Sequence, residues 1–246
     1  MSLGVSRRRL LKTLIGIGAV ALGIGIGSLK LLNTTRREES DLEADGELIK
    51  LPDPKKKGTV SIEEAIESRR SRRVYTNAPV LLSDISQLCW AAEGVTEADV
   101  GLRAAPSAGA LYPLELFLVV GNSDIAPGVY HYSCRDHALE PVKKGDYRKA
   151  LREASLGQEW VENSAIDLVI TAVYDRTTVK YGERGRDRYV PMEAGHVAEN
   201  IYLEAESLGL GTVSIGAFDD DQVREVISAP RDYVPLYVMP VGHAKA

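Results

Sequence analysis

A cluster of arginines draws attention because its residue types suit one kind of chemistry. Four of the five positions in residues 69–73 are arginine, and the fifth is Ser71. Guanidinium groups keep their charge throughout the physiological pH range, and their forked N–H donors match the oxygens of a phosphate dianion. A hydroxyl can add one more donor. The segment therefore predicts a phosphate-binding site; the alternative is a solvated helix end whose cations complement the helix dipole.

The charge of the rest of the chain limits which phosphates such a site would meet. The 246 residues carry 30 lysines and arginines against 35 acidic residues, a formal net charge of −5. Because residues 1–37 hold seven basic and no acidic residues, the remaining chain has a net charge of −12. Nucleic-acid phosphates would be repelled from so acidic a body outside a local basic patch. We therefore expect no nucleic-acid partner.

Metal and disulfide chemistry have little support in the sequence. The four histidines show no HExxH or comparable spacing, so we expect no metal site. Two cysteines without a CxxC motif cannot build a disulfide framework. Cys89 lies in an apolar helical pattern, which is typical of a core residue.

The N-terminal residues 1–37 predict a targeting segment. Residues 6–12, SRRRLLK, resemble the twin-arginine export motif, with Leu10 in place of its phenylalanine, and residues 13–29 carry no charge. The resemblance implies export of a folded, cofactor-loaded protein to a periplasmic or other extracytoplasmic location. The alternative is an outward-facing membrane anchor, since 17 helical residues would span about 25 Å of a ~30 Å hydrocarbon core. Cleavage of the segment stays open.

Residues 38–57 are charged, contain prolines and lack an apolar period, so they predict a tether.

Residues 58–246 predict one domain in which a capping box, Ser61 with Glu64, starts a helix that leads into the arginines. Helices and strands follow without a strict βαβ rhythm, which favours an α+β fold. The further predicted elements are a helix over 82–94 capped by Ser83, a strand over 114–121, a hairpin over 128–142, a helix over 146–157, a central strand over 165–174, a strand over 211–218, a helix over 219–227 and a last strand over 233–242.

The longest predicted helix starts at Pro191 and stops at Gly209. Its small and apolar residues occur nearly all around the helix. Such a helix is either buried or part of a subunit interface. We expect a homodimer whose interface includes residues 195–208.

Three separated blocks resemble the FMN-dependent nitroreductase family. Residues 68–80 are similar to its first cofactor segment, and residues 103–121 and 180–216 are similar to its SagB-type branch, the azoline dehydrogenases and their relatives. The resemblance covers roughly residues 58–243. It implies a nitroreductase-like mixed sheet flanked by helices, a long buried helix at a dimer interface, and FMN as the cofactor.

The resemblance also implies which residues contact FMN. Contacts to the phosphate and ribityl chain fall on Arg69, Arg70, Ser71 and Arg73. Arg72 is expected to point to solvent. A small-residue segment that packs on the flavin, commonly from the partner subunit, falls on Pro106, Ser107, Ala108 and Gly109. A turn that offers a backbone N–H to flavin N5 falls on Ile215, Gly216 and Ala217.

Lys180 and Tyr181 lie where SagB-type azoline dehydrogenases carry a Lys-Tyr pair assigned to proton removal. The resemblance therefore implies a catalytic base and its relay at these positions; the alternative is a charged surface loop. A further basic residue after the last strand, which reaches the phosphate in many family members, has only Lys245 as its counterpart here.

The predicted function is an FMN-dependent oxidoreductase. It would carry out two-electron, ping-pong dehydrogenation or reduction of a small molecule or a modified peptide. A flavin-binding redox sensor or electron-relay module without turnover is the alternative. A tethered maturation partner for a modified peptide is a third possibility.

Overall fold

The computed structural model describes residues 46–245 of the chain. The predicted export signal, residues 1–37, and the first part of the predicted tether lie outside the described residues. The rest of the tether is packed, because Ile49–Lys50 forms strand β1 and Leu51 is buried. The folded domain therefore begins before residue 58. No helix within residues 46–245 has the length and apolar character needed to cross a membrane.

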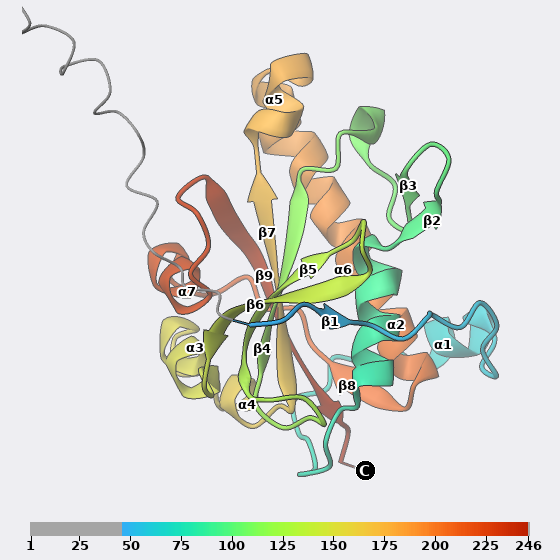
Figure 1. The fold of residues 1–246 in the computed structure, drawn as a ribbon, viewed down its shortest axis with the longest axis vertical. Helices are drawn as coiled ribbons and strands as arrows, with labels where there is room; N and C mark the ends of the chain where they lie inside the picture. Colours follow the sequence, from blue (N-terminus) through green and yellow to red (C-terminus); the bar gives the residue numbers. More distant parts are fainter. Residues whose placement is uncertain (1–45, 246) are drawn as a thin grey trace, which may run out of the picture. The chain divides into compact units, whose positions relative to one another are not determined.

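One sheet of seven strands forms the centre of the fold, in the order β1-β6-β5-β4-β7-β9-β8 (Figure 1). Its named neighbours all pair antiparallel, and a parallel component comes from an isolated bridge between Ser71 and Thr212. These pairings confirm the predicted α+β fold with a mixed sheet flanked by helices. The strands after β1 are β4 (Leu114–Val120), β5 (Gly128–Ser133), β6 (Ala138–Lys144), β7 (Ile166–Val173), β8 (Leu210–Thr212) and β9 (Tyr233–His243).

Helices cover both faces of the sheet. They are α1 (Ile62–Ser68), α2 (Leu82–Glu93), α3 (Arg148–Ala154), α4 (Glu159–Glu162), α5 (Asp175–Tyr181), α6 (Val190–Ser207) and α7 (Asp220–Val226). Helices α2 and α6 lie side by side on one face, and α3 and α7 pack together on the other. A small hairpin of β2 (Val95–Glu97) and β3 (Leu102–Arg103) lies outside the main sheet.

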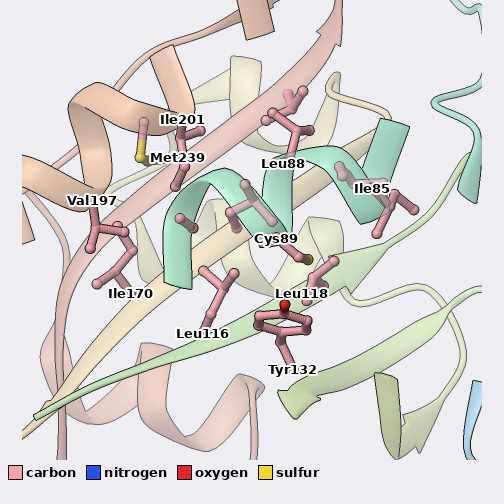
Figure 2. Packing of buried hydrophobic residues seen from close by; sticks show 14 of the residues in the cluster. Ile85, Leu88, Cys89, Leu116, Leu118, Tyr132, Ile170, Val197, Ile201 and Met239 are labelled. Atoms are coloured by element: carbon pink, nitrogen blue, oxygen red, sulfur yellow. The ribbon is translucent and has the colours of Figure 1, made fainter. Parts of the chain in front are cut away.

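Strand β4 shows how the sequence divides the core in two. Its alternate residues Leu114, Leu116 and Leu118 join the cluster under α2 and α6, whereas Phe117 and Val119 join the cluster under the other helices. A strand sends successive side chains to opposite faces, so a continuous apolar run is needed where both faces are covered. Figure 2 shows the first cluster, including Cys89, which is fully buried as predicted.

The starts of α1 and α2 show where the local sequence predicts a helix cap and where it does not. The predicted capping box of α1 is present, since the Glu64 N–H donates to Ser61 Oγ at 3.2 Å and the Ser61 N–H donates to Glu64 Oε2 at 2.8 Å. The predicted Ser83 cap of α2 is wrong. The helix begins at Leu82, whose N–H donates to Asp124 Oδ1 at 2.7 Å. Tertiary structure thus supplies the acceptor that a local cap would otherwise provide.

The long helix α6 has one buried and one exposed face. Pro191 lies in its first turn, and Gly209, with φ of 70°, follows its end as predicted. Val197 and Ile201 are buried against the sheet, whereas Met192 is 55% exposed. The apolar surface of α6 is therefore only partly used within one chain. Its predicted place in a dimer interface stays a prediction.

Strand β7 carries a charged residue type in the core. Asp167 is fully buried, and neither of its carboxylate oxygens has a hydrogen-bond partner among the described residues. The nearby hydroxyl of Ser164 donates to Val161 O at 2.8 Å instead. Burial raises the pKa of Asp167 well above its usual value, and the charge of Arg148 offsets this only in part. Burial therefore favours the neutral form of this carboxyl.

We expect Asp167→Asn to stabilise the protein at neutral pH. Because the pKa of Asp167 is higher in the folded than in the unfolded chain, the free energy of unfolding is highest below the unfolded pKa and falls as the pH rises toward the folded pKa. Asparagine removes this titration, so the gain should grow as the pH rises above the unfolded pKa, by at most about 1.4 kcal/mol per pH unit. Urea denaturation measures the gain, with the exposed Asp99→Asn as a control. A gain that does not change with pH would contradict a neutral carboxyl.

Candidate functional site

The arginine segment leaves α1 and docks on the edge of the sheet. Helix α1 ends at Ser68, and the chain then runs extended from Arg69. Ser71 pairs with Thr212 of β8, and the Arg72 N–H donates to Thr212 O at 2.8 Å. On the other side, the Lys245 N–H donates to Val74 O at 3.0 Å. The structure thus brings Lys245, the predicted late basic residue, beside the arginine segment.

The four guanidinium groups of the segment differ in their partners. Arg72, which was predicted to point to solvent, has 38% of its side chain exposed and lies 3.8 Å from the Glu206 carboxylate. Arg69 lies over the ring of Tyr202 at 5.1 Å, and Arg73 lies over the ring of Trp160 at 5.5 Å.

Arg70 donates to two backbone carbonyls of its own segment. Within residues 46–245, Arg69, Arg70 and Arg73 form no ion pair. Their positive charges are therefore not neutralised by the protein and are available to an anion.

A tyrosine joins the first sequence block to the third. Ser71 Oγ lies 3.1 Å from the Tyr202 hydroxyl, and the Ser214 N–H donates to the same oxygen at 2.8 Å. The turn that begins at Ser214 is thereby fixed beside the arginine segment. Tyr202 is not among the predicted site residues, because an aromatic residue in a buried helix gives no sign of a polar contact.

In the turn after Ser214, the predicted N–H donors differ in whether the protein already uses them. The Ile215 N–H already donates to Val238 O at 2.9 Å, and Ile215 is buried. Gly216 and Ala217 are exposed, and in the described part of the chain their N–H groups donate to no backbone carbonyl. These two N–H groups, rather than that of Ile215, are free to meet a ligand.

The small-residue segment lies elsewhere, against α5. Gly109 has φ of 68°, and a Cβ added there would lie 2.7 Å from the Tyr181 hydroxyl oxygen and 2.9 Å from Lys180 Nζ. The positive φ favours glycine at this position, whereas the two close atoms are the ends of flexible side chains. The structure therefore brings together three predicted site residues from two separate blocks, with Lys180 and Tyr181 packed side by side against Gly109.

A buried polar layer supports the small-residue segment. The Arg103 guanidinium lies 2.9 Å from Glu93 Oε2 and 4.6 Å from the centre of the Tyr112 ring. Burial raises the pKa of Glu93 to about 7, although the adjacent Arg103 acts in the opposite direction. Burial also raises the pKa of Glu193 in the first turns of α6, against the opposing effects of Ser107 and Ala108.

Helix α6 separates the two groups of predicted residues. Glu193 lies by the Ser107 segment, and Tyr202 lies by the arginine segment. Nine helical residues correspond to about 14 Å along the axis. Residues 106–109 and the arginines therefore lie beside different parts of α6, and the expectation that residues 106–109 serve a partner's flavin stays a prediction.

Neither Asn200 nor the cavity that it lines belongs to these two groups. Asn200 donates to Ala91 O at 2.9 Å, so it has a structural role. A cavity of about 470 Å3 lies between residues 55–61 and helices α1, α2 and α6, and its lining includes none of the predicted site residues. Within residues 46–245, no three His, Cys, Asp or Glu side chains are grouped so that they could hold a metal ion.

Comparison with known proteins now adds to this geometry. Residues 66–243, most of the chain, match the nitroreductase family. The chain belongs to the nitroreductase family. This membership makes it an oxidoreductase and a flavoprotein by family.

Three relatives illustrate the breadth of the nitroreductase family around this chain. A protein of Methanocaldococcus jannaschii that is named as a nitroreductase is 43% identical over 195 residues, 79% of this chain and 95% of the relative. A crystal structure from Ralstonia eutropha, also of a protein named as a nitroreductase, has a TM-score of 0.72 and 29% identity and covers 82% of this chain and 91% of its own. The microcin B17-processing protein McbC of Escherichia coli is 32% identical over 147 residues, 57% of this chain and 54% of its own length.

Proposed function

We propose that this nitroreductase is an FMN-dependent oxidoreductase of the SagB-type branch, with a two-electron, ping-pong reaction on a small molecule or a modified peptide. The observation that carries the proposal is the pairing of unneutralised arginines with exposed N–H groups beside Ser71. A ligand with an anionic group at one end and a ring nitrogen at the other would match these arginines and N–H groups. A similarity to McbC, named as a microcin B17-processing protein, supports the SagB-type branch and a modified peptide among the substrates.

The residues at the sheet edge fit the phosphate end of FMN. Three guanidiniums and the Ser71 hydroxyl offer charged and neutral donors on one extended segment. A phosphate dianion is held best by such forked, permanently charged donors. Arg69, Arg70, Ser71 and Arg73 would hold the phosphate and ribityl chain. Gly216 or Ala217 would donate a backbone N–H to the ring.

Lys180 and Tyr181 are proposed to handle the proton of the reaction. Bound FMN would supply a two-electron carrier that accepts a hydride from the substrate. A substrate that loses a hydride must also lose a proton, and Lys180 Nζ would take it, with the Tyr181 hydroxyl as relay. Both groups end against Gly109, on the segment proposed to face the partner's flavin.

A homodimer would complete each site. The arginine segment and the Gly109 segment lie on different parts of α6, so a second copy is proposed to supply the second group to each flavin. The exposed side of α6, with Met192 and the partly buried Leu203, is the proposed contact surface. Residues 1–37 would carry this dimer to the outside of the cytoplasmic membrane.

The purified 246-residue chain is expected to be yellow and to sediment as a dimer with one FMN per chain. Sedimentation monitored at the flavin absorption band measures the mass of the species that carries the cofactor, and chromatography after denaturation identifies the flavin. A colourless protein that cannot be reconstituted with FMN would remove the proposed function. A monomer that binds FMN tightly would remove the dimer and leave the flavin site.

A further inference from the structure

The loop that carries Gly109 has an unusual backbone. Besides Gly109, the non-glycine residues Ala110 and Tyr112 have positive φ angles, of 53° and 45°. Side-chain-bearing residues adopt this region at a cost in free energy, and the surrounding contacts must offset that cost. The conformation of residues 107–112 therefore depends on contacts with the surrounding residues.

Contacts on both sides of its backbone hold Tyr112. Its N–H donates to Ser107 Oγ at 2.9 Å, which closes the loop on itself. Its carbonyl accepts from Arg176 NH1 at 3.1 Å, which ties the loop to α5. Arg176 is thus a side-chain contact between the loop and the helix that bears Lys180 and Tyr181.

A chain of side chains across the sheet fixes Arg176. Its NH2 lies 2.5 Å from Glu115 Oε1 of β4, and Glu115 Oε2 lies 2.8 Å from His131 Nε2 of β5. His131 Nδ1 in turn lies 3.2 Å from Glu140 of β6. Burial acts to raise the pKa of Glu115, but His131 and Arg176 together lower it overall. Glu115 is therefore a charged anchor set in the sheet.

The guanidinium geometry is specific to arginine. One nitrogen faces the Glu115 carboxylate while another faces the Tyr112 carbonyl. A lysine ammonium could neutralise Glu115 but lacks the planar fork that reaches both acceptors. Only 15% of the Glu115 side chain is exposed, so this pair is less screened by solvent than a surface ion pair.

Helix α5 has little stability of its own. It has seven residues, far fewer than the roughly 12–15 that an isolated helix needs. Arg176 and Lys180 are four residues apart and share one face of the helix. Where Arg176 is fixed, the position of Lys180 is fixed as well.

We infer that Arg176 is a positioning residue. It locks the strained loop 107–112 to α5, and so holds Lys180 and Tyr181 against Gly109. Glu115, oriented by His131, holds Arg176. The inference rests on the proposed function for its catalytic meaning, because Lys180 is the group that Arg176 would serve.

A double-mutant cycle on the FMN-loaded full chain tests this role. Arg176→Ala should slow single-turnover flavin reduction about 10²-fold, the scale of a misplacement of about 1 Å. The same change made in Lys180→Ala should add little, since the group to be positioned is gone. Arg188→Ala, at an exposed position in the helical segment Gly185–Tyr189, is the matched control and should be silent. Additive effects of Arg176→Ala and Lys180→Ala would overturn the inference.

Hydrogen exchange without added substrate supplies an independent readout. Arg176→Ala and Arg176→Lys should both raise exchange in residues 107–112, while Arg176→Lys should keep the melting temperature near that of the wild type, which guards against a variant that fails to fold. Unchanged exchange in Arg176→Lys would overturn the inference. If Lys180→Ala is silent in turnover but exchange rises, the proposed base is wrong and the lock on the loop stands.

Discussion

Lys180→Ala is expected to slow reduction of the bound flavin by about 10²–10⁴-fold, the usual cost of losing a general base. Its Nζ lies against Gly109, where the ring of a partner's flavin is proposed to stack, so the proton acceptor is removed without disturbing the arginine segment. FMN affinity and reoxidation of the reduced flavin should both stay within about two-fold of the wild type, since neither requires the base. Stopped-flow single-turnover kinetics with one active donor separates the two half-reactions.

Two further variants sharpen that result. Tyr181→Phe removes only the hydroxyl that would relay the proton, so its effect should be smaller than that of Lys180→Ala. Lys149→Ala, at an exposed position on α3, should leave the rate unchanged. If Lys180→Ala and Tyr181→Phe are both silent with a substrate that must lose a proton, the azoline-dehydrogenase part of the proposal is wrong.

Arg70→Ala combined with Arg73→Ala is expected to weaken FMN binding by about 10²–10⁴-fold. Each charge-assisted contact contributes about 1.5–3 kcal/mol, and every 1.4 kcal/mol is about a factor of ten in Kd. Neither arginine has an acidic partner among the described residues. Replacing either one therefore removes a ligand contact without breaking an ion pair within the protein. Quenching of FMN fluorescence by the apoprotein measures the affinity.

Riboflavin, which lacks the phosphate, provides the matched ligand control. The double variant should lose much less affinity for riboflavin than for FMN, because riboflavin keeps the ribityl chain but lacks the phosphate. Arg72→Ala should weaken FMN binding much less, since its guanidinium is already paired with Glu206. Equal losses for FMN and riboflavin would mean that the arginines shape the protein and do not hold the phosphate.

Features that depend on neighbouring residues in the chain could be predicted from the sequence. The capping box of α1, the stop of α6 at Gly209 and the apolar run of β4 each carry their cause within a few residues. The cap of α2 could not be predicted, because its acceptor, Asp124, comes from a loop beyond β4. A residue 42 positions away leaves no local pattern.

The same limit explains what was missed around the site. The contact of Arg176 with Tyr112 and Glu115 depends on how α5 sits at the end of β7, which no periodicity encodes. Glu115 did leave one signal, since a charged residue interrupts the apolar run of β4. Asp167 leaves the same signal in β7. A charge within a buried strand is thus a sign of a long-range partner or of a neutral, buried carboxyl.

The bridge between Ser71 and Thr212 has a consequence for the order in which the protein is made. The arginine segment leaves the ribosome early, but the strand on which it docks is synthesised about 140 residues later. Contacts this distant in sequence form only after the chain between them has been ordered. A nascent chain that ends before β8 would therefore lack the strand on which the arginine segment docks. Binding of FMN at the proposed site would then have to follow the synthesis of β8, and an interrupted or truncated chain would leave the ribosome without the edge that holds the arginines in place.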